Sequence, residues 1–287
     1  MPGALTGRAV AANASALRRA GRLFRNAFRS PGVRQFGFRF AWDYLRMAWR
    51  AGRRWGSAAP GTLRFFGCRI AYPNQSHAVF LAHELFVNAA YDFDARTENP
   101  CIIDAGANIG MATVYFKARY PGARVTAYEP DPATFAILRG NVDANGLRGV
   151  TLIRAAVGDR AGVLPLYRET TSGGSVVASL DPSWGGAEAI EVPVIRLSDA
   201  ITEPVDLLKL DVEGAEYAVL RDLAAAGRLA MVRETVIEYH PLAAEPNGET
   251  GLAELLRSAG MDVIVTPGPT EAHAGIIRGR RPQIPTN

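Results

Sequence analysis

Acidic side chains follow several of the short apolar runs in this sequence. Asp104 and Glu129 each end such a run, and Asp211 follows another. If the runs are parallel strands, their carboxyl ends lie at one edge of an open sheet, and ligands bind beyond that edge. A carboxylate in that position holds a cationic group or accepts hydrogen bonds from hydroxyl groups. The pattern therefore predicts a site for a small polar ligand.

The segment after the first of these runs is rich in glycine. Gly106 and Gly110, with Asn108 between them, permit a tight turn and a close approach of the backbone to a ligand. The spacing is not the GxGxxG of dinucleotide sites, which place a pyrophosphate at a helix N-terminus. Asp104 beside the loop favours a cationic ligand instead. Glu129 lies 25 residues after Asp104, where it can accept both hydroxyls of a ribose.

A third segment of small residues follows the run 150–155. Ala156 and Val157 offer an apolar edge for an adenine, and Asp159 offers an acid for the adenine amino group. Each of the three segments alone is consistent with an ordinary turn. Their occurrence in register, after three successive runs, favours a nucleoside site.

The elements that position these residues follow an alternating pattern of strands and helices. Predicted strands cover 101–104, 124–129, 150–155, 206–210 and 232–238, and predicted helices cover 110–120, 132–145, 215–226 and 251–259. An antiparallel excursion is predicted from 163–167, 175–180 and 190–195, and a closing hairpin from 261–266 and 275–278. Such alternation predicts an α/β fold in which helices cover both faces of a mostly parallel sheet.

Four motifs give the sequence a family resemblance. They are IIDAGANIG (102–110), YEPDP (128–132), DLLKLDVEGAE (206–216) and IEYHP (237–241). Over about residues 76–280 the chain resembles the FkbM family of class I S-adenosylmethionine-dependent methyltransferases, and the last two motifs are the specific part. The resemblance implies a Rossmann-like fold with a mostly parallel seven-stranded sheet and an antiparallel C-terminal hairpin. It also implies O-methylation of sugars, polyketides or other natural products.

The resemblance assigns roles in binding S-adenosyl-L-methionine. It places Asp104 near the cofactor's ammonium group, Glu129 at the ribose hydroxyls, and Asp211 beside the methyl group. The remaining residues that it implies along the cofactor are Gly106, Ala107, Asn108, Gly110, Pro130, Ala156 and Val157.

Transfer of a methyl group to a hydroxyl also needs a group that takes the proton. We expect His240 to be this base because its unperturbed pKa lies near neutrality. Asp211 or Glu213 would orient His240 or take the proton instead. A purely structural role for His240, before Pro241, stays open.

The same rim offers a second use for its carboxylates. With a histidine they could hold Mg²⁺, which prefers oxygen ligands, although we assign no metal ligands from the sequence. We expect Lys209 to pair with Glu216 or Asp206. Glu84 and Tyr91 either close over the methionine end of the cofactor or pack as helix residues.

The remaining histidines show no pattern of partners. We interpret His77, His83 and His273 as non-catalytic.

The first 59 residues differ in composition from the rest. Residues 1–56 hold twelve arginines and one acid, Asp43, whereas the whole chain has a formal net charge of +4. Three hypotheses stay open: a helical cap that packs on the main domain, a surface for anionic lipid or an acidic partner, and a leader segment. We expect an N-terminal extension over 1–59 and a methyltransferase domain over 60–287, with an antiparallel insertion near 163–195.

Composition excludes several other classes of protein. A chain of 287 residues with 48% hydrophobic and 21% charged residues is globular rather than disordered. Cys68 and Cys101 are too few for a disulfide framework, and no run of 18 apolar residues predicts a membrane span. We expect a cytoplasmic protein, and peripheral membrane contact through 1–59 is one of the hypotheses that stay open. No pattern indicates the oligomeric state or a nucleic-acid module.

The sequence therefore predicts an O-methyltransferase that acts on a small-molecule, glycosyl or lipid-linked hydroxyl, and N-methylation stays open. A nicotinamide-dependent oxidoreductase is disfavoured because the chain lacks GxGxxG and a Tyr-x-x-x-Lys pair. The alternative is a non-catalytic methyltransferase-like module that docks a membrane or an acidic partner through its basic N-terminus.

Overall fold

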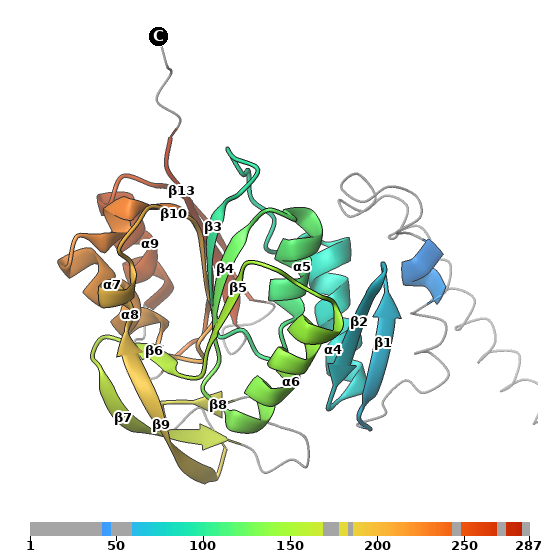
Figure 1. Ribbon diagram of the computed structural model, residues 1–287. Coiled ribbons are helices and arrows are strands. Elements are labelled where there is room, and N and C mark those ends of the chain that lie inside the picture. The colour runs from blue at the N-terminus through green and yellow to red at the C-terminus, as the bar shows by residue number, and fades with distance from the viewer. Residues whose placement is uncertain are drawn as a thin grey trace, which may run out of the picture.

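The computed structural model describes six parts of the chain. They are residues 42–46, 59–168, 178–182, 186–242, 248–268 and 274–282. A large central sheet stands between two groups of helices, and a smaller sheet lies at one end of it (Figure 1).

The central sheet has seven strands, as the sequence predicted. They are β3 (Cys101–Ala105), β4 (Arg124–Tyr128), β5 (Val150–Ile153), β10 (Val205–Leu210), β11 (Val232–Tyr239), β12 (Asp262–Thr266) and β13 (Gly275–Arg280). Their order is β12-β13-β11-β10-β3-β4-β5, and β13 alone runs antiparallel to its neighbours within this sheet. The chain moves outward from β3 to β5 and then returns to β10 on the other side of β3. The ends of β3 and β10 are therefore the switch point at which open α/β sheets bind ligands.

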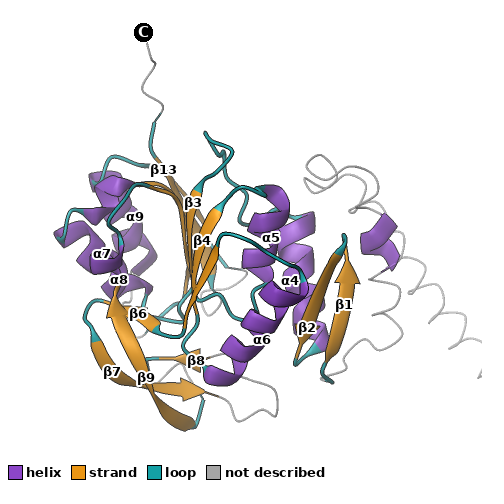
Figure 2. Cartoon of the chain, viewed as in Figure 1, coloured by secondary structure: helices purple, strands orange, loops and turns teal. Residues whose placement is uncertain are grey.

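Helices cover both faces of this sheet (Figure 2). One face carries α4 (Gln75–Ala82), a π-helical turn at His83–Val87, α5 (Met111–Arg119) and α6 (Pro132–Ala144). The other face carries α7 (Leu197–Ala200), α8 (Glu216–Ala225) and α9 (Gly248–Ser258), with a 3₁₀ turn at Arg228–Met231. Each group buries its own apolar cluster against the sheet.

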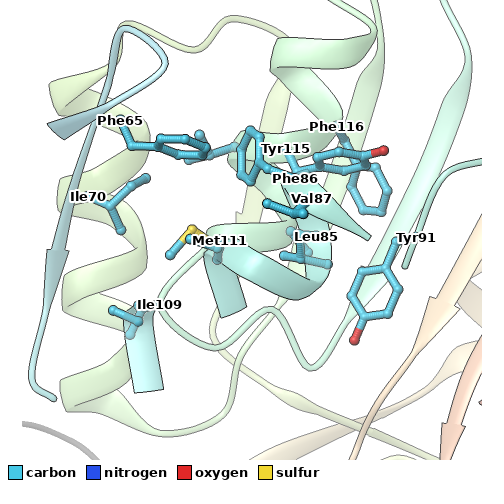
Figure 3. Packing of buried hydrophobic residues seen from close by; sticks show 14 of the residues in the cluster. Phe65, Ile70, Leu85, Phe86, Val87, Tyr91, Ile109, Met111, Tyr115 and Phe116 are labelled. Carbon is cyan, nitrogen blue, oxygen red and sulfur yellow. The ribbon is translucent and has the colours of Figure 1, made fainter. Parts of the chain in front are cut away.

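Aromatic rings dominate the cluster under α4 and α5 (Figure 3). Phe86 lies edge-on to both Phe65 and Tyr115, with ring centroids 5.1 Å apart in each pair. Tyr91 lies at the margin of this cluster, and its hydroxyl points away from the other rings (Figure 3). Packing in this cluster therefore holds the segment that carries Tyr91 in place near the end of the sheet.

The predicted antiparallel excursion forms a second, four-stranded sheet. Its strands are β6 (Ala156–Gly158), β7 (Gly162–Arg168), β8 (Ala178–Ser179) and β9 (Glu188–Arg196), in the order β6-β9-β7-β8. The β7–β9 and β7–β8 pairs are antiparallel, and β6 pairs with β9 in parallel. The parallel β6–β9 pair adds a strand that the sequence pattern did not separate from β5.

A hairpin before α4 was not predicted. Its strands β1 (Gly61–Phe65) and β2 (Cys68–Tyr72) are antiparallel. Two asparagines bind the backbone of β2, one within α6 and one at its C-cap. Asn141 accepts from the amide of Ala71 and donates to its carbonyl, and the C-cap Asn145 does the same with Arg69. Asn141 also donates to the carbonyl of Ile109 in the glycine loop. These bonds attach the hairpin to α6 and to the loop.

One short piece of the N-terminal extension lies within the described residues. Residues 42–46 are helical, and Tyr44 is buried with its hydroxyl 2.6 Å from Nδ1 of His83. This piece packs on the main domain, as the cap hypothesis requires. The rest of 1–58 lies outside the described residues, so the lipid-binding and leader hypotheses stay untested. Within the described chain, no helix combines the length and the apolar character needed to cross a bilayer.

Candidate active site

A pocket opens at the carboxyl ends of β3, β4 and β10. It encloses about 600 Å³ of space that no atom fills, part of which is open solvent. Its lining comes from Gly106, Asn108, Tyr128, Glu129, Pro130, Thr134, Ala155, Ala156, Val157, Leu166, Ala178, Leu180, Asp211, Val212 and Glu213. Seven of the ten predicted cofactor residues are in this set, as is Glu213. Asp104, Ala107 and Gly110 are not.

The glycine loop packs directly on the end of β10. The backbone of Gly106 has φ +78, and a Cβ on this residue would collide with the carbonyl of Asp211. The amides of Gly106 and Ala107 donate to the carbonyl of Tyr128 at 3.1 and 2.8 Å. Asn108 is also left-handed, with φ 51, and its side chain accepts from the amide of Ile109. The loop therefore holds its shape through β4 and presents backbone groups to the pocket.

Glu129 occupies the position predicted for a ribose acid. It is 6% exposed, and its two carboxylate oxygens accept from the amides of Asp131 and Asn108, both at 2.9 Å. Burial raises the pKa of Glu129 to about 7, although both amide bonds act in the opposite direction. Each oxygen keeps a second lone pair for a hydroxyl of a bound ligand.

An ion pair joins the smaller sheet to the segment after β4. Asp131 is fully buried and caps α6 by accepting from the amide of Thr134 at 2.8 Å. Arg168 at the end of β7 binds Asp131 at 2.5 Å and Glu188 on β9 at 3.0 Å. No sequence pattern pointed to Arg168, because its partner lies 37 residues away.

The opposite wall of the pocket is apolar. Ala156, Val157 and Leu166 are all buried, and they line the pocket together with Ala178 and Leu180 from the β8 region. A flat aromatic base fits between such side chains. Asp159 is exposed and does not line the pocket, so the predicted contact with an amino group has no support here.

Lys209 links the acidic residues at the base of the pocket. Its ammonium lies 3.4 Å from Oδ1 of Asp104 and 3.3 Å from Oδ2 of Asp211, and it donates to the carbonyl of Gly106 at 2.5 Å. The expected partners, Glu216 and Asp206, were wrong. Register explains the result, because Lys209 pairs directly with Asp104 across β10 and β3. Burial alone would lower the pKa of Lys209, but the neighbouring carboxylates raise it.

Asp104 lies beneath the pocket rather than in its lining. It is fully buried, accepts from the hydroxyl of Thr113 at 2.7 Å and faces Lys209. Its predicted contact with the cofactor's ammonium therefore stays a prediction.

The turn after β10 is fixed by a buried carboxylate. Glu216 accepts from the amides of Val212 and Gly214, both at 2.9 Å. Glu213 has φ 52 within this turn, and its carbonyl accepts from the hydroxyl of Ser179. A non-glycine residue in the left-handed region persists only where its surroundings hold it. The turn thus holds Glu213 so that its side chain lies at the rim of the pocket.

His240 lies between two carboxylates. Its Nδ1 is 3.1 Å from Oε1 of Glu216, and its Nε2 is 3.2 Å from Oε2 of Glu213. Both ring nitrogens can donate to ionised carboxylates at the same time only in the imidazolium form. Burial opposes this charge, but the bond to Glu216 and the charges of Glu216, Glu213 and Asp211 raise the pKa of His240 to about 9.

A protonated imidazole cannot take a proton. The geometry therefore favours His240 as a cation that positions Glu213, and its predicted role as the base stays untested.

The metal hypothesis meets a specific obstacle. Asp211, Glu216 and His240 each offer a ligand atom, and these atoms lie within 4.8 Å of one another. However, Glu216 already accepts two amides, and the ring nitrogens of His240 face carboxylates as donors. A divalent ion would have to displace these contacts, so the residues fit Mg²⁺ poorly.

A second group of side chains approaches Asp211 from the face of α4. Tyr91 donates to Oε2 of Glu238 at 3.1 Å, and the ammonium of Lys209 lies 5.7 Å from the centre of its ring. Among the described residues, the Nε2 atom of His77 is buried and has no hydrogen-bond partner. Burial lowers the pKa of His77, whereas the charge of Asp211 acts in the opposite direction. Glu84 instead accepts from Asn88 within its own segment.

The structure describes one of the two remaining histidines. His83 binds Tyr44, and His273 lies outside the described residues.

Comparison with known proteins decides the family. The profile of the methyltransferase FkbM domain matches residues 104–262, which is more than half of the chain. The chain belongs to the FkbM methyltransferase family. The matched region contains all of the lining residues of the pocket.

Named members of this family and its relatives align along much of the chain. The 31-O-demethyl-FK506 methyltransferase FkbM of Streptomyces tacrolimicus is 32% identical and covers 72% of this chain and 92% of its own length. Methyltransferase sdnD of Sordaria araneosa is 33% identical, with coverage of 65% and 83%. The 2-O-methyltransferase NoeI of Sinorhizobium fredii is 28% identical, with coverage of 48% and 62%.

A solved FkbM methyltransferase from Methylobacillus flagellatus is more distant. It shares 14% identity with a TM-score of 0.44, covering 71% of this chain and 54% of its own.

Proposed function

We propose that this FkbM-family methyltransferase uses S-adenosyl-L-methionine to methylate a hydroxyl of a small molecule, sugar or other natural product. The observation that carries the proposal is the buried carboxylate of Glu129. It lies at the end of β4 in a pocket whose other wall is apolar, so a ribose and an adenine each meet the chemistry they require.

The pocket residues fit the cofactor along its length. Glu129 would accept the two ribose hydroxyls, and Ala156 and Val157 would flank the adenine. Gly106 and Asn108 would lie beside the methionine portion, and Asp211 and Glu213 would lie near the methyl group. Bound in this way, the cofactor supplies a methyl group that a sulfonium has already activated for transfer.

The protein's own contribution is then positioning and electrostatics. Aligning the acceptor oxygen with the methyl carbon removes much of the entropic barrier. Asp211 and Glu213 favour a positively charged ligand at this end of the pocket. Lys209 and the His240 cation hold these two carboxylates in place.

The names of the relatives support a hydroxyl acceptor. Both a 31-O-demethyl-FK506 methyltransferase and a 2-O-methyltransferase are among them. A release factor glutamine methyltransferase also matches over 28% of this chain, so transfer to nitrogen is the second candidate. The non-catalytic module is less favoured, because the acids at the three strand ends are all in place.

Binding of S-adenosylhomocysteine tests the cofactor site directly. Calorimetric titration of the full chain should show micromolar binding, and Glu129→Ala should weaken it by about 1–3 kcal/mol, the usual consequence of losing a charged hydrogen-bond partner. The exposed Glu254→Gln is the matched control and should leave the affinity unchanged.

The acceptor is tested with S-adenosylmethionine and a panel of methyl glucoside, myo-inositol and geraniol, with mass spectrometry of the products. A well-folded protein that binds no S-adenosylhomocysteine would contradict the proposal.

A further inference from the structure

We propose that Glu238, and not His240, takes the proton from the acceptor hydroxyl, with Tyr91 as the residue that positions it. This inference rests on the proposed function, since it names the base for that same reaction.

The sheet register places Glu238 beside the pocket. Lys209 pairs with Val236 and Leu210 pairs with Ile237, so the next residues along the two strands, Asp211 and Glu238, are also neighbours. Successive side chains of a strand alternate between the faces of the sheet. Asp211 and Glu238 therefore lie on the same face as Lys209, toward α4. Because Asp211 lines the pocket, Glu238 flanks it on the side away from the adenine wall.

Glu238 differs from the other ionisable groups at this rim in its hydrogen bonding. The carboxylate of Asp211 faces Lys209, and that of Glu213 faces His240. Glu238 instead accepts from a neutral phenol, the hydroxyl of Tyr91.

The second oxygen of Glu238 is available to an acceptor. Among the contacts of the described residues, Oε1 accepts no hydrogen bond. Glu238 is only partly buried, and neither of its oxygens is a buried atom without a partner. Oε1 therefore remains within reach of a ligand at the edge of the pocket, while Oε2 is held by Tyr91.

The surrounding charges bring Glu238 into the useful range of pH. The charge of Asp211 is the largest cause and burial the next, and together they raise the pKa of Glu238 to about 7. His240 at the end of the same strand, Lys209 on β10 and the Tyr91 bond oppose this rise. His77 faces Asp211 from α4. A base is most effective when its pKa lies near the working pH.

The proton and electron balance of the step is simple. The O–H bond of the acceptor breaks, and its proton moves to Oε1 of Glu238. The freed electron pair on oxygen forms the bond to the methyl carbon. The carbon–sulfur bond breaks and leaves its pair on sulfur, so a methyl ether and S-adenosylhomocysteine are formed. Glu238 then releases the proton to solvent.

The first test follows the carboxyl groups themselves. Full-length protein carrying ¹³C at the glutamate carboxyls is titrated by NMR from pH 5 to 9, with S-adenosylhomocysteine bound. We expect a resonance with a midpoint near 7 that is lost in Glu238→Gln. Tyr91→Phe should shift that midpoint upward, because the lost bond favoured the ionised form. Midpoints for Glu238 below 5, in wild type and in Tyr91→Phe alike, would overturn the proposal.

The second test is the pH profile of methyl transfer to the best acceptor of the panel. In wild type at a saturating concentration of S-adenosylmethionine, which removes the contribution of Glu129 to cofactor binding, kcat/KM for the acceptor should rise with pH through about 7. Glu238→Gln should lower kcat by about 10²–10⁴-fold and remove this rise, with the affinity for S-adenosylhomocysteine kept. His240→Gln should keep the rise, and Glu254→Gln serves as the control with the wild-type profile.

The results that would contradict the assignment of the base differ from those that would contradict the proposed function. Full kcat in Glu238→Gln, or loss of the pH dependence in His240→Gln alone, would assign the base to another residue. Absence of S-adenosylhomocysteine binding in wild type would instead refute the proposed function, whatever the Glu238 variants do.

Discussion

Removal of the ammonium group of Lys209 should destabilise the protein more than any ordinary loss of a hydrogen bond. The side chain of Lys209 is 3% exposed, and that of Asp104 is fully buried. In Lys209→Met, Asp104 keeps its bond from Thr113 but loses the cation that compensates its charge. Breaking a buried ion pair by removing one partner costs about 3–5 kcal/mol, because an uncompensated charge remains in the interior.

The chain contains its own matched control. Lys117 is the second of only two lysines, and it donates to the carbonyls of Pro121 and Ala123 at 2.7 and 2.6 Å. Lys117→Met therefore removes two hydrogen bonds without leaving a carboxylate behind, and we expect a loss of about 1–3 kcal/mol.

Urea unfolding followed by circular dichroism measures both losses in the ligand-free protein. The double variant Asp104→Asn with Lys209→Met should recover a large part of the stability lost in Lys209→Met, because it no longer has an uncompensated carboxylate at position 104. Equal losses in the two lysine variants, together with no recovery in the double variant, would refute the electrostatic argument.

Three further perturbations address the pocket. The ionised form of Glu129 accepts hydrogen bonds from the ribose hydroxyls, and the pKa of Glu129 is raised to about 7. Calorimetry should therefore show the dissociation constant of S-adenosylhomocysteine rising about tenfold per pH unit below 7. A constant affinity from pH 5 to 8 would contradict this. The raised pKa of His240, about 9 against 6.5, stabilises the fold by roughly 3 kcal/mol below pH 6.5, and this is lost as pH rises through 9. Urea unfolding should therefore show His240→Gln less stable than wild type at pH 6 and close to it at pH 10, whereas a gap independent of pH would indicate another cause. Gly106→Ala forces a left-handed alanine against the carbonyl of Asp211, so thermal unfolding should show a loss of at least about 1–3 kcal/mol; wild-type stability would show that the loop relaxes.

The sequence locates the glycine loop and the acid after β4 at the pocket because the signals there are local. A strand that ends in an acid, followed by glycine, identifies the loop at Gly106, and the same reasoning identifies Glu129. Both sites depend on residues within a few positions of one another. The mostly parallel character of the central sheet follows equally from the alternation of strands and helices.

The charge state of His240 could not be predicted, because it depends on two carboxylates that belong to another loop. Glu213 and Glu216 reach His240 only after β10 and β11 pair and the turn between β10 and α8 forms. A histidine near neutral pKa in isolation becomes a cation in that setting. The unperturbed pKa alone therefore does not describe His240.

The wrong pairing of Lys209 had a usable signal. Lys209 and Asp211 are two residues apart, so the alternation of a strand already places them on one face. Glu238 ends an apolar run, as Asp104 does, and it carried the same signal for a place at the rim. The β1–β2 hairpin lacked such a signal, because its turn uses Phe66 in a left-handed conformation before Gly67.

Asn141 of α6 and Asn145 at its C-cap have a consequence for the choice of a shorter fragment of the chain. Each side-chain amide accepts one hydrogen bond from the backbone of β2 and donates one to it, as the backbone of a neighbouring strand would. Asn141 at the same time binds the glycine loop. The region that matches the family profile begins at residue 104, after this hairpin, and ends at residue 262, before β13 enters between β11 and β12. A fragment trimmed to 104–262 would keep every residue of the pocket. It would nevertheless leave these amides without partners, and it would lose β13 and almost all of β12, so that β11 becomes the edge of the sheet. The recognisable motif is therefore smaller than the unit that folds.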